Sequence, residues 1–187
     1  MKRRAMFLAA LFAATALVAQ QSAAPQLPET TSVRNYLRVN ETICTGGQPT
    51  TEELAMLKAG GVRSILNLRR PSEYNHAEEE KKAKELGLRY FNIPVSSADP
   101  KPEQVDEFLK VMRDPAVRPA FIHCGSANRV GAFWMIYRVV EDGAPAAEAE
   151  AEARKIGLRD GPARDFALKY IADRAANKKK ASGPPCC

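Results

Sequence analysis

The chain has 187 residues and a formal net charge of +6 at pH 7. This length provides one domain with a sizeable core rather than two. The two ends, Lys2–Arg4 and Lys178–Lys180, carry the whole excess of basic residues, so the body between them is neutral. A nucleic-acid-binding protein would need a basic face on that body, and we therefore expect no nucleic-acid partner.

Residues 1–19 have the pattern of a secretory signal peptide. A basic start precedes the apolar run Ala5–Ala19, and small and polar residues follow it. The run is too short for a helix that spans a bilayer. We expect an exported protein, periplasmic or secreted, with no stable membrane insertion after the signal is cleaved. A polar linker is expected over residues 20–35.

The first half of the chain alternates between short β-forming runs and helical segments. Two runs separated by Asn40-Glu41 are typical of a hairpin. Thr50 and Glu53 form a capping box, and Asn75 is expected to cap the next helix together with a glutamate three residues on. The run Glu78–Lys82 is typical of a solvated helix face with charge pairs. The elements expected here are strands at 36–39, 42–44 and 62–68 and helices at 50–60 and 75–86.

The second half continues the alternation, with prolines at helix starts and glycines at helix ends. Strands are expected at 88–95 and 118–122, and helices at 102–113, 132–140, 144–156 and 162–176. This order predicts an α/β fold with a mostly parallel sheet and helices on both faces. The domain is expected over residues 36–176, and the tail 177–187, rich in Lys, Ser, Gly and Pro, is expected to be disordered.

Cys124 lies in a short loop that ends a predicted strand and leads to a predicted helix. The N–H groups at a helix N-terminus bind anions and favour a thiolate. Arg129 adds a planar cation whose shape matches two phosphate oxygens. A single cysteine is usually an inert, buried residue. The coincidence of His123, Cys124, a small polar loop and Arg129 favours a nucleophile in an anion-binding loop.

The four cysteines are too few for a disulfide scaffold. The two histidines, His76 and His123, are not spaced as metal ligands with other ligands, so we expect no metal and no other cofactor. Cys44 is the other cysteine of the body. Oxidation of an activated Cys124 is therefore expected to end in a sulfenic acid or in a disulfide with Cys44.

Four segments between Tyr36 and Arg159 resemble the cysteine-phosphatase superfamily. The resemblance is to its atypical dual-specificity branch and to the bacterial domains called beta-lactamase-hydrolase-like phosphatases. It implies a tyrosine-phosphatase-like fold and a hydrolase that cleaves phosphate monoesters through a phosphocysteine. The substrate would be a phosphorylated protein or a small phosphate ester. The segments are Gly46–Pro49, Gly61–Arg69, Gly87–Val95 and Phe121–Gly131.

The resemblance also implies roles for single residues. Cys124 would attack phosphorus, Arg129 would clamp the phosphoryl oxygens, and His123 would support the loop. The family draws a general acid from the loop after the strand at 88–95, where Asp99 lies; Asp is also favoured as a turn or helix-entry residue. The phosphate-binding residues would be Gly125, Ser126, Ala127, Asn128 and Arg129.

Two features depart from the common loop of that family. Four residues separate Cys124 from Arg129, where five are usual; four is also the spacing of rhodanese-type sulfurtransferases. Val130 stands where a Ser or Thr usually assists departure of the thiolate. Two alternatives stay open: a phosphate-binding module without turnover, and a rhodanese-like sulfurtransferase that uses Cys124. The loop contains no lysine, so it makes no special provision for a multiply phosphorylated ligand.

Overall fold

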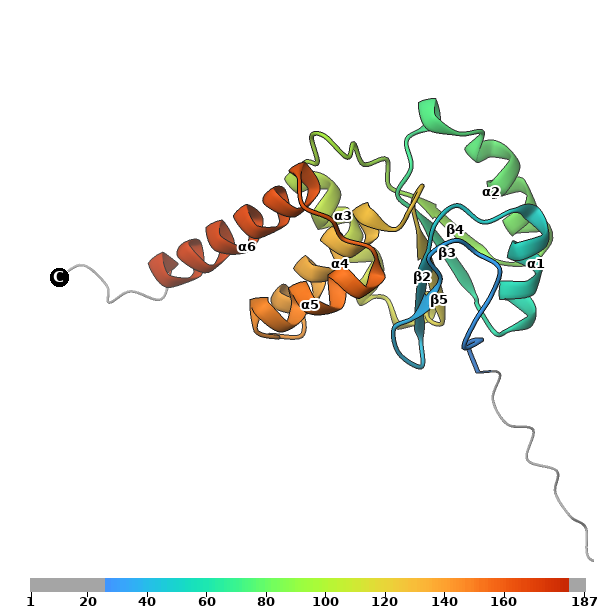
Figure 1. Cartoon of the computed structure of the whole chain (residues 1–187), viewed down its shortest axis with the longest axis horizontal. Helices are drawn as coiled ribbons and strands as arrows, with labels where there is room; N and C mark the ends of the chain where they lie inside the picture. Colours follow the sequence, from blue (N-terminus) through green and yellow to red (C-terminus); the bar gives the residue numbers. More distant parts are fainter. Residues whose placement is uncertain (1–25, 182–187) are drawn as a thin grey trace, which may run out of the picture.

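A five-stranded sheet runs through the centre of the computed structural model, which describes residues 26–181 (Figure 1). The strands are β1 (Leu37–Arg38), β2 (Ile43–Gly46), β3 (Ser64–Asn67), β4 (Arg89–Asn92) and β5 (Ala120–His123). Their order in the sheet is β1-β2-β5-β3-β4. β1 pairs antiparallel with β2, and the other pairs are parallel. The carboxyl ends of the parallel strands therefore share one edge of the sheet.

Helices cover both faces of this sheet, which confirms the predicted fold class (Figure 1). Helices α1 and α2 lie on one face, and α3 to α6 lie on the other. The helices are α1 (Thr51–Ala59), α2 (His76–Glu85), α3 (Pro102–Arg113), α4 (Asn128–Val140), α5 (Ala146–Ile156) and α6 (Pro162–Ala181), with the 3-10 turns η1 (Pro71–Glu73) and η2 (Pro115–Val117).

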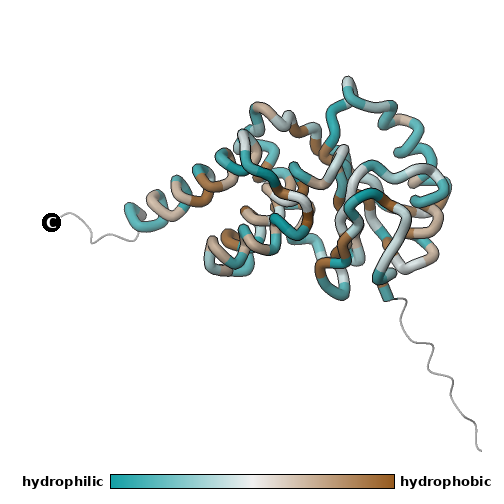
Figure 2. The backbone as a smooth tube through the Cα atoms, viewed as in Figure 1, coloured by the Kyte–Doolittle hydropathy of each residue, from teal (hydrophilic) through white to brown (hydrophobic). Residues whose placement is uncertain are grey.

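The central strand β5 divides the core between the two faces. Ile122 and Cys124 pack in the cluster formed with α3 to α6. Phe121 packs with Cys44 in the cluster formed with α1 and α2. All four side chains are buried. The residues of α2 are hydrophilic over most of its length (Figure 2). Successive residues of β5 thus face opposite layers, as the pleat of a strand requires.

Several local predictions are confirmed. The hairpin between β1 and β2 is closed by Asn40, whose Oδ1 accepts the N–H of Thr42 and of Ile43, each at 2.9 Å. At the start of α1, the Thr50 hydroxyl accepts the Glu53 N–H at 3.2 Å, and the Glu53 carboxylate accepts the Thr50 N–H at 2.8 Å. α3 spans the predicted residues.

The starts of two helices and the cap of a third differ from the prediction. α5 begins at Ala146 instead of Ala144, with Pro145 just before its first turn. α4 begins at Asn128 instead of Ala132, because Ala127 adopts a left-handed conformation (φ 66°) that turns the chain directly into the helix. The expected cap of α2 is wrong, since the Asn75 side chain makes no capping hydrogen bond. Its ψ of 79° lies outside the extended region that a capping residue normally adopts.

The ends of the domain are longer than the sequence indicated. Leu27 and Val33, within the expected linker, are buried against the domain. α6 continues to Ala181, where the sequence predicted a disordered tail from residue 177. Three lysines in its last turn complement the helix dipole and favour this extension.

The expected signal peptide, residues 1–19, lies outside the described residues. None of the helices within 26–181 is both long and apolar enough to cross a membrane.

Candidate active site

Cys124 directly follows β5 at the carboxyl edge of the sheet, where open α/β folds bind their ligands. The loop Cys124–Ala127 connects this strand to α4. Ala127 is left-handed although it is not glycine, a conformation that costs on the order of 1 kcal/mol or more. The loop therefore stores backbone strain, which persists only where surrounding contacts impose it.

Contacts on both sides hold the loop in this conformation. Ser126 forms a β-bridge with Gly47, just beyond β2. Asn35 donates from Nδ2 to the Ser126 carbonyl at 3.1 Å, and Arg159 donates from Nη2 to the Ser126 hydroxyl at 3.0 Å. The Arg159 backbone N–H also donates to Asn128 Oδ1 at 2.8 Å. The expected phosphate-binding residues Gly125, Ser126, Ala127, Asn128 and Arg129 thus form one braced turn.

Arg129, in the first turn of α4, is only 5% exposed. Its Nη1 donates to the carbonyls of Leu68 and Val95, at 3.2 and 2.7 Å. Its Nη1 and Nη2 also donate to the two carboxylate oxygens of Glu73, at 3.0 and 2.8 Å. Arg129 is therefore fixed by residues that follow β3 and β4, at the same edge of the sheet as Cys124.

Charges on both sides of Arg129 act on its titration and on that of its partner. Burial lowers the pKa of Arg129, but the hydrogen bonds with Glu73 and the charge of Cys124 outweigh it and raise the pKa. Burial raises the pKa of Glu73, but the hydrogen bonds from Arg129 and Arg70 outweigh it and lower the pKa to about 2. The guanidinium thus stays charged between Glu73 and the thiol.

His123, the residue before Cys124, contacts a buried carboxylate. Its Nε2 lies 2.7 Å from Glu79 Oε1, and both side chains are fully buried. The His123 ring also stacks on Phe121, with the ring centroids 5.5 Å apart. The sequence pattern placed Glu79 on a solvated helix face, and this prediction is wrong. Glu80, by contrast, is partly exposed and pairs with Lys84 at 2.6 Å, as predicted for the same run.

Three further polar side chains converge on Glu79 and were not predicted. Gln48, Asn67 and Tyr90 donate to Glu79 Oε2 at 3.3, 3.0 and 3.4 Å. Burial raises the pKa of Glu79, but the charge of His123 and these hydrogen bonds lower it below its usual value. Each donor comes from a different segment of the phosphatase resemblance. Those segments therefore meet under the cysteine loop, which is a signal that the sequence contained.

Asp99, the candidate general acid, has an exposed side chain. It pairs with Lys101 at 2.5 Å, and none of its contacts within residues 26–181 reaches Cys124 or Arg129. The start of its loop does reach the site, because the Val95 carbonyl accepts from Arg129. In the part of the chain that the structure describes, no group of three or more His, Cys, Asp or Glu side chains could hold a metal ion.

Comparison with known families identifies a match over most of the chain. The model of a family described as a DSP-PTPase phosphatase fused to NAD+ kinase matches residues 12–166. A beta-lactamase hydrolase-like protein of Xylella fastidiosa (strain Temecula1) is 26% identical over 149 residues, covering 78% of this chain and 33% of that protein. A protein of the same description from Agrobacterium fabrum is 31% identical over 97 residues, covering 50% of this chain and 22% of that protein. The chain thus spans a third or less of the length of these relatives.

Solved structures share the fold. A DUF442 protein of Shewanella putrefaciens CN-32 has a TM-score of 0.66 at 24% identity, covering 76% of this chain and 94% of its own. The core catalytic domain of the PP-IP phosphatase SIW14 of S. cerevisiae, in complex with citrate, has a TM-score of 0.64 at 21% identity. The match covers 80% of this chain and 93% of that domain. A cysteine-to-serine variant of TpbA of P. aeruginosa, in complex with pTyr, has a TM-score of 0.63 at 18% identity. The match covers 87% of this chain and 99% of that protein's chain.

Proposed function

Because the chain belongs to the family of DSP-PTPase phosphatases fused to NAD+ kinase, we propose that it is a cysteine-dependent phosphatase that hydrolyses phosphate monoesters. Cys124 is the proposed nucleophile. Arg129 and the backbone amides of the loop 125–129 hold the phosphoryl group. No metal or other cofactor takes part in the proposed reaction.

The reaction proceeds in two displacements on phosphorus. The Cys124 thiolate attacks the phosphoryl group, the P–O ester bond breaks, and the leaving oxygen takes a proton from a general acid or from water. Water then attacks the phosphocysteine, the P–S bond breaks, and inorganic phosphate leaves with the thiolate restored. In both steps the charge on the equatorial phosphoryl oxygens is stabilised by Arg129 and by the N–H groups at the start of α4.

The placement of a fixed arginine at the same edge of the sheet as Cys124 carries this proposal. Arg129 is oriented by the Glu73 carboxylate and by the carbonyls of Leu68 and Val95. An inert buried cysteine would need neither a strained turn nor an oriented cation beside it. The relatives solved with pTyr and with citrate support an anionic ligand, and we propose a phosphorylated protein or a small phosphate ester as substrate.

Hydrolysis of an aryl phosphate, with vanadate as inhibitor, tests this function. The Cys124→Ser protein should lose turnover and still bind vanadate, because Arg129 and the loop amides remain. Arg129→Ala should weaken vanadate binding as well as turnover, since it removes charge-assisted contacts. Undiminished hydrolysis by Cys124→Ser would rule out the proposed nucleophile.

One observation favours the alternative of a phosphate-binding module without turnover. The Ser126 hydroxyl contacts Arg159, and Val130, which follows Arg129, is buried and carries no hydroxyl. The position after Arg129 therefore supplies no hydroxyl to the departing thiolate, and the Ser126 oxygen accepts from Arg159. Vanadate binding without phosphate release from any aryl ester would favour this alternative. Thiocyanate formation from thiosulfate and cyanide would instead favour the sulfurtransferase, although none of the relatives named above is one.

We also propose that the protein is exported, on the strength of the N-terminal sequence pattern. Fractionation of expressing cells should then recover the protein in the periplasm or the medium, shortened at its N-terminus. Recovery of the full-length chain in the cytoplasm would contradict this proposal.

A further inference from the structure

A cavity of about 440 Å³ lies beside the cysteine loop. We call it the flank cavity. One wall is the segment 34–36 that leads into β1, and the other is the end of α5 with the turn after it. Its lining residues are Arg34, Asn35, Tyr36, Arg154, Lys155, Ile156, Gly157, Leu158 and Arg159. Four of these side chains are cationic and none is a carboxylate, although the body of the chain is neutral overall.

Three of the four cations form no ion pair, although the charge of Lys155 acts on the neighbouring Glu152. Arg154 pairs with Glu150 and Asp160, at 2.9 and 2.7 Å. Arg34, Lys155 and Arg159 form no ion pair within 4.0 Å of their nitrogens, as far as residues 26–181 show. A concave surface that gathers unpaired charge of one sign focuses its field on the space between the walls. The flank cavity is therefore suited to an anion.

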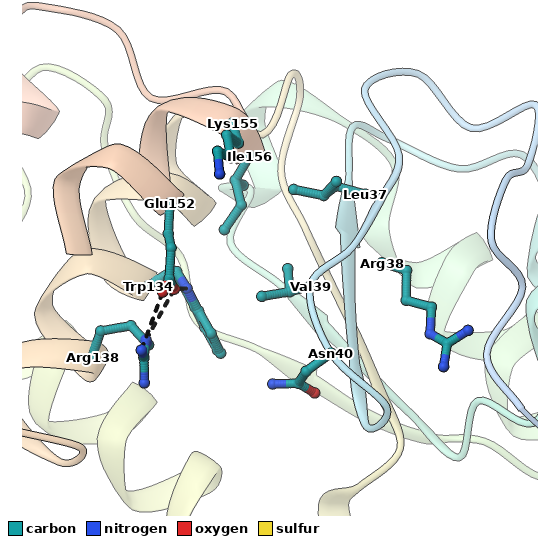
Figure 3. A pocket seen from close by; sticks show the side chains of 9 residues that line it. All are labelled: Leu37, Arg38, Val39, Asn40, Trp134, Arg138, Glu152, Lys155 and Ile156. Carbon is teal, nitrogen blue, oxygen red and sulfur yellow. Dashed lines mark hydrogen bonds and ion pairs between the residues drawn. The ribbon is translucent and has the colours of Figure 1, made fainter. Parts of the chain in front are cut away.

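The neighbouring cavity provides a contrast (Figure 3). It has a volume of about 460 Å³ and shares Lys155 and Ile156 with the flank cavity. Apart from the shared Lys155, its charged side chains are paired. Glu152 accepts from Trp134 Nε1 at 3.0 Å and from Arg138 Nε at 2.9 Å, and Arg38 pairs with Glu29. Arg138 also donates to Asp142 at 2.6 Å. The arginines of that cavity are thus already paired with acids, whereas the flank cavity adds Arg34 and Arg159, which form no ion pair with the described residues.

Two residues that line the flank cavity also hold the cysteine loop. Asn35 donates to the Ser126 carbonyl, and Arg159 donates to the Ser126 hydroxyl. Ser126 is two residues from Cys124, so their Cα atoms are at most about 7 Å apart. A group bound in the flank cavity would therefore lie next to the group held by the loop.

We propose that the flank cavity binds a second phosphate group of the substrate, so that the enzyme prefers esters that carry a second phosphate close to the one held by the loop. This inference rests on the proposed phosphatase function. The loop itself contains no lysine, and the cations come from segments on either side of it. Arg34 and Lys155 supply charge from opposite walls, and Arg159 presents its guanidinium where the cavity meets the loop.

Paired substrates and paired variants test the proposal. The substrates are 1,4-phenylene bisphosphate and 4-methoxyphenyl phosphate, which differ in the second phosphate. The test variant is Arg34→Ala/Lys155→Ala. Its control is Arg63→Ala/Lys110→Ala, which removes two exposed cations from the amino-terminal side of β3 and from α3. The ratio of kcat/KM for the bisphosphate to that for the monophosphate should fall about tenfold in the test variant, as expected for two partly exposed ion pairs, and less than twofold in the control.

A binding arm separates failure of this inference from failure of the proposed function. In the Cys124→Ser background, which should not turn over, calorimetry should show about tenfold weaker binding of the bisphosphate when Arg34 and Lys155 are both alanine. Lys155→Arg should retain the affinity, because the charge is kept. Turnover with an unchanged ratio and unchanged binding would overturn the second site and leave the phosphatase proposal intact. An equal loss for both substrates would also overturn it, since the cations would then act on the catalytic phosphate alone.

Discussion

Glu79 is a buried carboxylate whose partners decide whether it stabilises the fold. Removing a carboxylate from water costs several kcal/mol, and attraction to a cation offsets this only when the remaining lone pairs are also satisfied. Glu79 Oε2 accepts from three donors, and Glu79 Oε1 lies 2.7 Å from His123 Nε2. The residue next to Cys124 is therefore positioned by a polar cluster that tolerates little change.

We predict that Glu79→Gln lowers the free energy of unfolding by about 3 kcal/mol, since it removes one partner of a buried pair. The pKa of Glu79 is lowered in the folded protein, so its contribution is present above the ordinary Glu pKa of about 4.3 and is lost as pH falls through the folded value. Urea unfolding at pH 7 and near pH 3.5 should show a smaller pH dependence in the variant than in the wild type. Glu80→Gln, a change at the adjacent exposed residue, is the control and should behave as wild type.

Asp99 can be tested as general acid through the leaving group. A general acid matters most when the leaving oxygen is a poor one, so Asp99→Ala should slow alkyl phosphate hydrolysis about 100-fold and p-nitrophenyl phosphate hydrolysis much less. Asp106→Ala is the control, because Asp106 lies on α3 and accepts from Tyr170 at 3.2 Å. If Asp99→Ala changed the rates of both esters by the same factor relative to the wild type, Asp99 would be a helix-entry residue and not the general acid.

Single residues also mark the limit of what the sequence could predict. Cys124, His123 and Arg129 were identifiable because their types and spacing carry chemistry. Glu79 was not, because a run of glutamates does not indicate which one turns inward. Ala83, four residues later, is the other buried residue of α2. The spacing of Glu79 from this small apolar residue, which places both on one helix face, was the available signal. Glu73 was missed because its hydrogen bonds to Arg129 join the η1 turn to α4, two segments that are far apart in the chain.

At the scale of elements, α4 and α5 approach unusually closely at Gly131. A Cβ added there would lie 2.8 Å from the Ala153 carbonyl oxygen and 2.9 Å from Leu158 Cβ. Alanine is favoured over glycine inside a helix by about 1 kcal/mol. The overlap costs on the order of 1–3 kcal/mol and should outweigh that gain. Close packing therefore requires glycine in the helix that carries Arg129.

We predict that Gly131→Ala destabilises the protein by up to about 2 kcal/mol, measured by urea unfolding. Gly125→Ala is a matched comparison in the neighbouring loop. Its added Cβ would meet nothing closer than Arg129 Nη2 at 3.7 Å, an ordinary contact. Its free energy of unfolding should change by less than about 0.5 kcal/mol. A stabilised Gly131→Ala protein would show that α5 can move away from α4.

The η1 turn depends on a single carboxylate. Glu73 links the turn to Arg129, and Glu73→Gln should therefore speed hydrogen exchange of the Glu73 amide by about tenfold or more. The pKa of Glu73 is about 2 in the folded protein. Its stabilising contribution is therefore present above the ordinary pKa of a Glu carboxyl and is lost as pH falls toward 2. The wild-type protection factor should then approach that of the variant. Glu103→Gln, at the exposed start of α3, should leave the exchange unchanged.

Element positions were largely predictable, because prolines and glycines mark most helix ends and buried runs mark the strands. The start of α4 was not, since nothing in the sequence indicates that Ala127 adopts a left-handed conformation. That conformation is imposed by Gly47, Asn35 and Arg159, which are distant in the chain. The extended α6 was missed because its lysines were interpreted as a tail.

At the scale of the whole molecule, the sheet separates the two cysteines of the described chain. Cys44 packs with the α1 and α2 layer and Cys124 with the α3 to α6 layer, and both are free thiols. Burial raises the pKa of Cys44 to about 12, which keeps it protonated and unreactive. The expected disulfide between Cys44 and Cys124 would need one side chain to cross the sheet, so we withdraw that expectation.

Peroxide should therefore convert Cys124 to a sulfenic acid that dimedone traps, with no Cys44–Cys124 disulfide in peptide maps. Cys186 and Cys187 are replaced by serine for this measurement. Cys44→Ala should give the same yield of dimedone adduct, because Cys44 takes no part. An intrachain disulfide, or a yield that depends on Cys44, would mean that the two layers open enough for the thiols to meet.

The strand order also decides when the molecule can fold. β5 is the central strand, yet it is the last to be synthesised. Its neighbours β2 and β3 cannot complete their pairing until β5 has been made. The contact from the Cys44 thiol to the Ala120 carbonyl, for example, joins residues 76 positions apart. Such long loops must close before their contacts can stabilise the sheet, which slows folding. A fragment that ends before residue 120 would leave β2 and β3 with unpaired edges, and such edges template aggregation between chains.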